Sequence, residues 1–139
     1  MGRPQTGNEV VDAVLGAAHR VRRSMDTGLR ASGLSLPTYK LLRELSRGER
    51  SMRELSDVLR VTPRTVTDMV DGLESRGQVE RRPHPTDRRV TRVHLTEVGA
   101  KDLEGIGEQA EAVRDRAIAG LSAAEKATLV SLLDRIAAS

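Results

Sequence analysis

Apolar residues recur at helical spacing along most of the chain. Over residues 8–30 they follow one another at steps of three and four residues, which predicts a long amphipathic helix. The same spacing predicts a second long helix at 97–119, capped by Thr96, and a last helix at 123–137, which a capping-box pattern opens. The chain therefore begins and ends with amphipathic helices.

Shorter helical patterns with clear end signals occupy the middle of the chain. After a connector at 31–36, Pro37 suits the first turn of a helix that ends at Gly48. Ser51 and Glu54 form a capping-box pattern that opens the next helix. We expect the inward-facing side chains to be Tyr39, Leu41, Leu42 and Leu45 in the first of these helices, and Met52, Leu55, Val58 and Leu59 in the second.

A fourth helical pattern occupies residues 63–76. Thr62 can cap its N-terminus, and Pro63 fits the first position because the N–H group that proline lacks would be unpaired there. Gly77 is placed as a left-handed C-terminal stop. The expected buried stripe is Val66, Met69, Val70 and Leu73. The side chains that remain near the N-terminus therefore face outward, and they are Arg64, Thr65, Thr67 and Asp68.

From Gln78 the apolar period changes from helical to alternating. Val79 lies on one strand and Val93 with Leu95 on a return strand, separated by a polar turn rich in proline, which predicts a β-hairpin. Together these elements predict a mainly α-helical fold with a small β wing, the pattern of a winged helix-turn-helix. We expect this region at 35–96, flanked by helical segments at 1–34 and 97–139.

Positive charge is concentrated around the predicted hairpin. The chain carries 23 Lys+Arg against 20 Asp+Glu, a formal net charge of +3. Within residues 76–94, however, six arginines face two acids, Glu80 and Asp87. Such a concentration attracts an anionic partner even when the whole molecule is nearly balanced, and nucleic acid is the leading candidate. The six are Arg76, Arg81, Arg82, Arg88, Arg89 and Arg92.

Composition excludes several other classes. The chain has no cysteine, so it can form neither a disulfide nor a thiol-oxidation switch, in keeping with a reducing cytoplasm. No apolar run approaches the ~20 residues of a membrane-spanning helix, and the polar start lacks a signal-peptide stretch. We expect a soluble, cytoplasmic protein with no membrane partner and no cofactor. Tyr39 is the single aromatic residue, which counts against binding single strands by base stacking.

Double-stranded DNA suits the predicted elements, because a helix such as 63–76 fits the major groove. Arg64 can make paired hydrogen bonds to guanine O6 and N7, and Thr65 and Thr67 can contact phosphates or a thymine methyl group. The helix N-terminus itself favours phosphate. A merely solvated helix face is the alternative. The full set of residues expected at the DNA on this helix is Thr62, Arg64, Thr65, Thr67 and Asp68.

The hairpin tip predicts a second contact with DNA. An arginine held on a rigid ribbon suits a narrow minor groove, which we expect for Arg88 and Arg89, with Asp87 as an orienting partner. An ordinary exposed turn is the alternative here. The remaining hairpin arginines lie on the strands, and the sequence leaves open whether they contact phosphates or form internal ion pairs. They are Arg81, Arg82 and Arg92.

Two stretches of the chain resemble the MarR family of bacterial transcription regulators. "TPRTVTDMVDGLESRGQVERR" is similar to the family's recognition helix, and "HPTDRRVTRVHLTEVG" is similar to its wing. Gln78 departs from the resemblance, since an apolar residue is common there, and this puts the packing of the strand in doubt. The resemblance implies a homodimer with interlocked terminal helices that binds a pseudo-palindromic operator, more often as a repressor, with Arg89 entering the minor groove and Arg88 close by.

The resemblance also implies a small effector. Family members often respond to phenolic or anionic ligands in the crevice between the dimer helices and the DNA-reading region, where His19, Arg23 and Tyr39 are the side chains to inspect.

Independently of the resemblance, the apolar faces of 8–30, 97–119 and 123–137 exceed what a DNA-reading region of ~60 residues could cover, which favours a two-fold dimer.

Other functions fit the sequence less well. An enzyme would need converging catalytic groups, and we expect none. His84 and His94 lie on the hairpin and are expected to face solvent, while His19 is expected on the dimer face or the surface; a zinc site is permitted by residue type, but no tight histidine spacing supports it. An architectural DNA-binding protein without a specific operator is the main alternative, since phosphate contacts alone do not read bases. A pure scaffold protein would leave the arginine-rich hairpin without a role.

Overall fold

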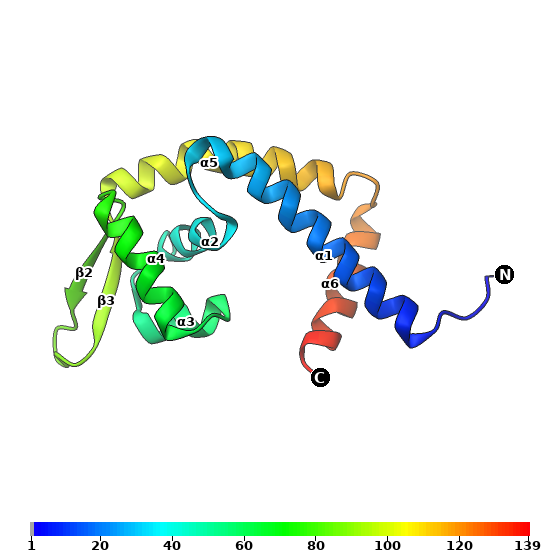
Figure 1. Cartoon of the computed structure of the whole chain (residues 1–139), viewed down its shortest axis with the longest axis horizontal. Helices are drawn as coiled ribbons and strands as arrows, with labels where there is room; N and C mark the ends of the chain where they lie inside the picture. Colours follow the sequence, from blue (N-terminus) through cyan, green and yellow to red (C-terminus); the bar gives the residue numbers. More distant parts are fainter. Residues whose placement is uncertain (1) are drawn as a thin grey trace.

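The structure is a computed structural model that describes residues 2–139. In Figure 1, α1 and α5 cross along the top of the molecule, a lobe formed by α2, α3, α4 and the β2–β3 wing lies below one end, and α6 lies below the other. The prediction of a mainly helical fold with a small β wing is confirmed. The elements are α1 (Gly7–Leu29), η1 (Arg30–Ser32), α2 (Leu36–Leu45), β1 (Arg50–Ser51), α3 (Met52–Leu59), α4 (Pro63–Ser75), β2 (Val79–Pro83), β3 (Thr91–Leu95), α5 (Glu97–Ala117) and α6 (Ala123–Ala137).

The predicted capping residues set the helix starts. The Thr62 side chain accepts a hydrogen bond from the backbone of α4, and Thr96 does the same for α5. Ser122 and Glu125 form the complete capping box of α6. Ser51 also caps α3, but the carboxylate of Glu54 lies 3.9 Å from an arginine of β3 instead of completing a box. Helix boundaries therefore follow from local hydrogen bonding that the sequence displays.

The hydrophobic core lies within the lobe and extends to the C-terminal end of α1. The predicted stripe of α4 is confirmed, with Met69 half-buried and the other three residues buried. Val58 is 51% exposed, so its predicted inward position is wrong. Ser56 is buried in α3, where its hydroxyl donates to the Val61 carbonyl at 2.6 Å and closes the turn before α4. The fully buried side chains are Leu29, Leu41, Leu42, Leu55, Leu73, Val66, Val70, Val79 and Val93.

The turn between α3 and α4 contains a residue in the left-handed region. Arg60 has φ 55° and ψ 45°, and its N–H donates to the Asp57 and Ser56 carbonyls at the end of α3. Residues other than glycine and asparagine rarely adopt this backbone conformation, which costs of order 1–3 kcal/mol. Arg60 thereby sets the angle at which α4 leaves α3.

The sheet contains one strand that the sequence did not predict. β2 and β3 form the expected antiparallel hairpin, with Val79 opposite Leu95 and Arg82 opposite Arg92. The two-residue strand β1 adds to the other edge of β3, giving the order β1-β3-β2. The wing is therefore anchored to the start of α3 as well as to the end of α4.

Gln78 joins α4, the wing and α5. Its N–H donates to the Leu73 carbonyl at the end of α4, and its carbonyl accepts from Thr96 N at 3.1 Å. Its side chain is 6% exposed, and its Nε2 donates to Asp102 Oδ2 of α5 at 3.0 Å. Gly99 lies so close that a Cβ there would be 2.1 Å from the Gln78 carbonyl oxygen. The strand accommodates a polar residue at this position because α5 supplies a partner for Nε2, while Oε1 of Gln78 is buried without a hydrogen-bond partner among the described residues.

Arg81 fastens the wing to α4. Its guanidinium lies 2.5 Å from Asp71 Oδ1 and 2.7 Å from Glu74 Oε1, and its backbone N–H donates to the second oxygen of Glu74 at 3.0 Å. The backbone and side-chain hydrogen bonds from Arg81 lower the pKa of Glu74 below its ordinary value of 4.5. These contacts fix the wing relative to α4.

We expect Gly99→Ala to destabilise the protein, because the added methyl group would overlap a backbone carbonyl that cannot move without shifting β2. The expected loss in the free energy of unfolding is about 1–3 kcal/mol. Gly105→Ala on the same helix is the control: no atom lies within 4 Å of a Cβ there, and helix propensity predicts a gain of roughly 0.5–1 kcal/mol. Urea denaturation at equal protein concentration measures both; equal behaviour of the two variants would contradict the prediction.

We expect Arg81→Met to lower the free energy of unfolding at neutral pH by about 1 kcal/mol. Because the pKa of Glu74 is lowered in the folded chain, its contribution to stability is present above 4.5 and is lost as the pH falls below that value. The difference between the wild type and the variant should therefore shrink in acid. Arg82→Met is the control, since the Arg82–Glu80 pair is half exposed on both sides. A difference that stays constant with pH would refute this account.

Candidate nucleic-acid interface

The N-terminal part of α4 presents the side chains that the sequence placed outward. Arg64, Thr65, Thr67 and Asp68 are all exposed. Within residues 2–139, neither Arg64 nor Asp68 takes part in a salt bridge. The Thr65 hydroxyl lies 2.9 Å from the Thr62 hydroxyl, and the Thr67 hydroxyl donates to the Pro63 carbonyl at 3.0 Å. The hydroxyl groups are thus held against the helix, while the Arg64 guanidinium is available to a ligand.

The tip of the wing holds one arginine on a carboxylate. Asp87 Oδ1 accepts from both the backbone N–H and Nε of Arg89 at 3.1 Å, and Asp87 Oδ2 accepts from Nη2 at 3.3 Å. These side-chain and backbone hydrogen bonds lower the pKa of Asp87 below its ordinary value of 3.8. The Arg89 side chain is nevertheless 90% exposed. Asp87 therefore restrains Arg89 without removing it from solvent, and Arg88 beside it is exposed too.

The arginines on the strands form internal ion pairs. Besides the Arg81 contacts with α4, Arg82 Nη2 lies 3.0 Å from Glu80 Oε2. Arg92 Nε lies 3.1 Å from Glu49 Oε1, although its N–H is not aligned for a hydrogen bond, so this contact is an electrostatic one. Of the two roles that the sequence left open for these side chains, internal pairing is the one that the geometry displays.

The hairpin histidines are less exposed than predicted. His94 Nε2 lies 2.7 Å from Glu49 Oε2, with 22% of its side chain exposed. His84 is half-buried in the wing turn, where its Nδ1 faces backbone N–H groups. The prediction that both face solvent is wrong because each has a polar partner in the hairpin or beside it. His19 is exposed on α1, as expected. The described residues contain no group of three potential metal-ligating side chains.

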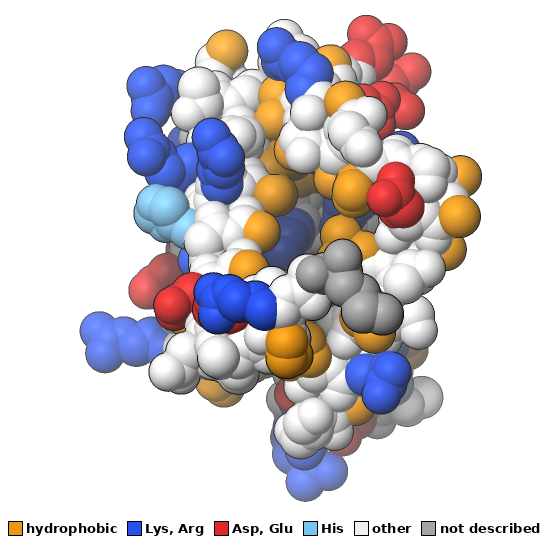
Figure 2. Space-filling view, turned by 90° about the vertical axis from the view of Figure 1, so that its right-hand side faces the viewer, with side chains coloured by type: hydrophobic (Ala, Val, Ile, Leu, Met, Phe, Trp, Pro, Cys, Tyr) orange, Lys and Arg blue, Asp and Glu red, His pale blue; other side chains and the backbone are white. Residues whose placement is uncertain are grey.

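The terminal helices leave a large apolar surface uncovered. Figure 2 views the molecule from the side that carries α6 and the start of α1, and apolar side chains gather there around a hollow in the centre of the face. Only Met25 and Leu29 of α1 are buried, and no residue of α6 is buried within the described chain. The large exposed apolar side chains of these two helices are Val10, Val11, Leu15, Val21, Leu129, Val130, Leu132, Leu133 and Ile136.

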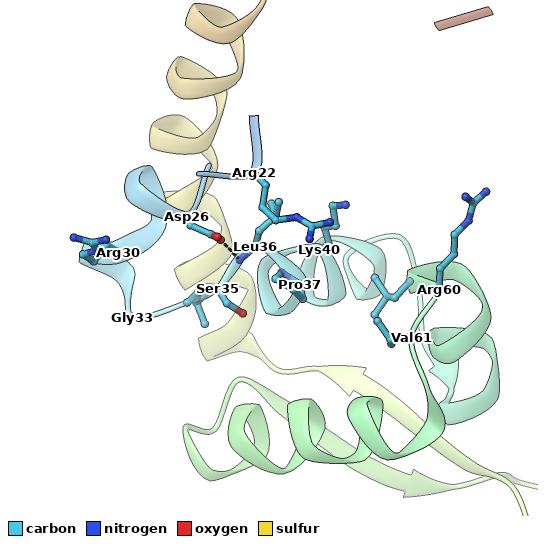
Figure 3. Close-up of a pocket in the computed structure, with 12 residues that line it drawn as sticks. Arg22, Asp26, Arg30, Gly33, Ser35, Leu36, Pro37, Lys40, Arg60 and Val61 are labelled. Carbon is cyan, nitrogen blue, oxygen red and sulfur yellow. Dashed lines mark hydrogen bonds between the residues drawn. The ribbon is translucent and has the colours of Figure 1, made fainter. Parts of the chain in front are cut away.

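A cavity of about 820 Å³ lies between α1 and the helix-turn-helix. Figure 3 shows Arg22 and Lys40 close to each other in the middle of the view, between Arg30 on one side and Arg60 on the other. Asp26 is its single acidic residue, and one carboxylate oxygen accepts from the Leu36 N–H at 3.2 Å. The cavity is therefore positively charged. Sequence reasoning missed it, because its walls come from segments whose approach no local pattern reveals.

The side chains predicted at an effector site do not meet in one place. His19 and Arg23 line a second cavity, of about 610 Å³, between α1 and α5. Tyr39 lines neither of these two cavities: it is 3% exposed and packs in the core, with the Arg43 guanidinium 5.8 Å from the centre of its ring. The reason is that α2 uses its aromatic residue to fill the centre of the lobe.

No helix of residues 2–139 is both long enough and apolar enough to cross a bilayer.

Comparisons with known proteins agree with this geometry. A family model described as "MarR family" matches residues 34–91. The chain is 31% identical to the HTH-type transcriptional repressor IacR of Pseudomonas putida over 83% of this chain and 70% of that protein. It is 30% identical to the HTH-type transcriptional regulator MhqR of Bacillus subtilis over 88% of this chain and 86% of that one.

A solved structure gives the same result. A mutant form of MarR from E. coli, crystallised with operator DNA, superposes with a TM-score of 0.84 at 28% identity, over 96% of this chain and 99% of that one. The match extends from the winged lobe through both terminal helical segments, which rules out a likeness confined to the DNA-reading region. The chain belongs to the MarR family of transcriptional regulators.

Proposed function

We propose that the protein is a homodimeric repressor that binds a pseudo-palindromic operator. The observation that carries the proposal is the placement of Arg64, Arg88 and Arg89, which are exposed on the two elements that reach DNA in a winged helix-turn-helix. The arginines on the strands are paired to carboxylates, whereas Arg89 is 90% exposed even in its pair with Asp87. Repression, rather than activation, is supported by the likeness to a relative that is named as a repressor.

In this proposal α4 lies in the major groove and the wing reaches the adjacent minor groove. Arg64 reads guanine through two hydrogen bonds, and Asp68 limits which base is accepted beside it. The exposed methyl groups of Thr65 and Thr67 contact thymine methyls or the sugar edge, because their hydroxyls are already engaged. The N-terminus of α4, which Thr62 caps, faces a phosphate. Arg89, restrained by Asp87, enters the minor groove with Arg88 next to it.

The dimer is supported by the uncovered faces of α1 and α6. Large apolar side chains on these two helices would remain in water in a lone chain, and contiguous apolar surface of this kind is typical of a subunit interface. A two-fold arrangement is the commonest way to close such an interface. It also places two copies of α4 about one turn of DNA apart, as a palindromic operator requires.

Selection from a random duplex library at near-physiological salt tests the proposal. We expect the wild-type protein to enrich an inverted repeat with half-sites about 10 base pairs apart. Arg64→Ala should relax the preference at one position of each half-site, with a loss of about 1–3 kcal/mol on the preferred base. Arg88→Ala combined with Arg89→Ala should weaken retention of the same motif.

Arg82→Ala serves as a control from the same hairpin, because it removes one arginine, ion-paired to Glu80, where the double variant removes two at the tip. Retention of duplexes without any motif would contradict the proposal and favour an architectural DNA-binding protein, whose affinity depends on phosphates alone. Equal weakening by the Arg82 and the double wing variants would contradict the assigned role of the wing tip.

We further propose that a small phenolic or anionic effector binds the cavity between α1 and the helix-turn-helix and relieves repression. The support is its positive lining and its position, since it touches both a dimer helix and the turn before α4. An effector acts only if it binds one geometry of the dimer more tightly than the other. A ligand held by Arg22 and Lys40 meets this condition, because the two side chains belong to the two parts that must move.

Arg22 and Arg23 provide a matched test, since these neighbours line different cavities. With salicylate as a simple phenolic anion, we expect weakened binding of the selected duplex by the wild type. Arg22→Met should reduce the affinity for salicylate roughly tenfold, whereas Arg23→Met should leave it nearly unchanged. Calorimetry and duplex binding measure the two effects. The reverse ranking would assign the effector to the cavity of His19 and Arg23 instead.

A further inference from the structure

The turn of the wing is built around the imidazole of His84. His84 Nδ1 lies 3.2 Å from the backbone nitrogen of Thr86 and 3.1 Å from that of Asp87, and both N–H groups point at it. The hydroxyl of Thr86 lies 3.2 Å from the same atom. Three polar groups at the start of the turn therefore face the same ring nitrogen.

The protonation state of this nitrogen follows from its partners. Backbone N–H groups can only donate, so Nδ1 must be the acceptor and must carry no proton. The geometry of the turn is that of an imidazole with an unprotonated Nδ1 and its proton on Nε2. Protonation of Nδ1 would put a third N–H against two others, which removes both hydrogen bonds and leaves the backbone donors of the turn unpaired.

The same hydrogen bonds determine where Arg89 lies. The backbone of Asp87, held by Nδ1, accepts from the Val90 N–H at 3.0 Å, and the His84 N–H donates to the Val90 carbonyl at 2.9 Å. The Asp87 carboxylate in turn holds both the backbone and the guanidinium of Arg89. The position of the exposed guanidinium thus depends, through Asp87, on an unprotonated imidazole.

We propose that His84 is a positioning residue of the wing and that its protonation weakens DNA binding through Arg89. The proposal rests on the proposed function of Arg89 as a minor-groove contact. Since the ordered turn requires the neutral ring, its stabilisation is present at higher pH and is lost as the pH falls.

The charged groups around His84 belong to the hairpin. They are Asp87 and its partner Arg89 in the turn, and the register pair Arg82 and Arg92 on the strands, each of which is ion-paired to a glutamate. Asp87 stays ionised at about pH 5.5, because Arg89 lowers its pKa below 3.8. A change between about pH 7.5 and 5.5 therefore tests the imidazole and not the carboxylate.

Two substitutions separate acceptor geometry from charge. In His84→Asn, Oδ1 stands at the place of Nδ1 and accepts the same hydrogen bonds without titrating. In His84→Gln, the amide reaches the place of Nε2 and leaves the two backbone N–H groups without a partner. His19 and His94 are unchanged in both variants, so their titration cancels when each variant is compared with the wild type.

The first measurement needs no DNA. Nuclear magnetic resonance of the full chain with labelled histidine should show neutral His84 with its proton on Nε2. The backbone amide signals of Thr86 and Asp87 should shift together with the titration of this ring. A proton on Nδ1 of the neutral ring, or amide signals that do not follow its titration, would overturn the proposal.

The second measurement is affinity for the selected duplex at the two pH values. We expect the wild type and His84→Asn to bind alike near pH 7.5, and the wild type to bind roughly three- to tenfold more weakly than His84→Asn near pH 5.5. His84→Gln should be weaker than both near pH 7.5. Parallel pH profiles of the wild type and His84→Asn would overturn the proposal.

Arg89→Ala separates this inference from the proposed function. Protonation also adds a positive charge that attracts phosphate whether or not Arg89 is present. We expect the loss of affinity at low pH relative to His84→Asn to be absent in an Arg89→Ala background, because the turn then has no arginine to position and only the attraction of the added charge remains. A loss of affinity that persists there would overturn positioning through Arg89. If Arg89→Ala binds as tightly as the wild type near pH 7.5, it is the proposed role of the wing that fails.

Discussion

The arrangement of the whole molecule depends on the close approach of α5 to Gln78, which lies between α4 and β2. Gly99 can pack against the Gln78 carbonyl because it has no side chain, and the Thr96 N–H and hydroxyl donate to the carbonyls of Gln78 and Gly77. Three elements meet here: α4, the wing and the long helix α5. The direction of α4 is thereby fixed relative to α5.

Charge serves two purposes in this chain. The cluster of six arginines that the sequence displays is mostly structural: Arg81, Arg82 and Arg92 have acidic partners, and Arg76 donates to the Gly33 carbonyl before α2. The tip of the wing carries Arg88 and Arg89, and the side chain of Arg89 is 90% exposed. A net charge of +3 therefore understates the positive field at the tip, because compensating acids lie beside the structural arginines.

Local signals predicted the elements, and long-range contacts account for what they missed. Helix starts at Thr62, Thr96 and Ser122 follow from capping, which involves residues three positions apart. The strand β1 is two residues long and exists only because β3 lies beside it, so no alternation could reveal it. Polar residues depended on their partners in the same way: Gln78 is buried because Asp102 faces it across 24 positions of sequence.

The wing and the α1 cavity act on different quantities in the proposed function. A disordered wing weakens the contact of its own subunit with one half-site. The resulting loss of affinity for DNA does not depend on the distance between the two copies of α4. A ligand in the cavity bears on the angle between α1 and the helix-turn-helix, and hence on the distance between two copies of α4, which matters only for a dimer on a two-fold operator. The hydrogen bonds at Gln78 tie α4 to the wing and to α5, so the lobe moves as a unit. A change in the angle therefore weakens the contacts of α4 and of the wing with DNA together with the match in spacing.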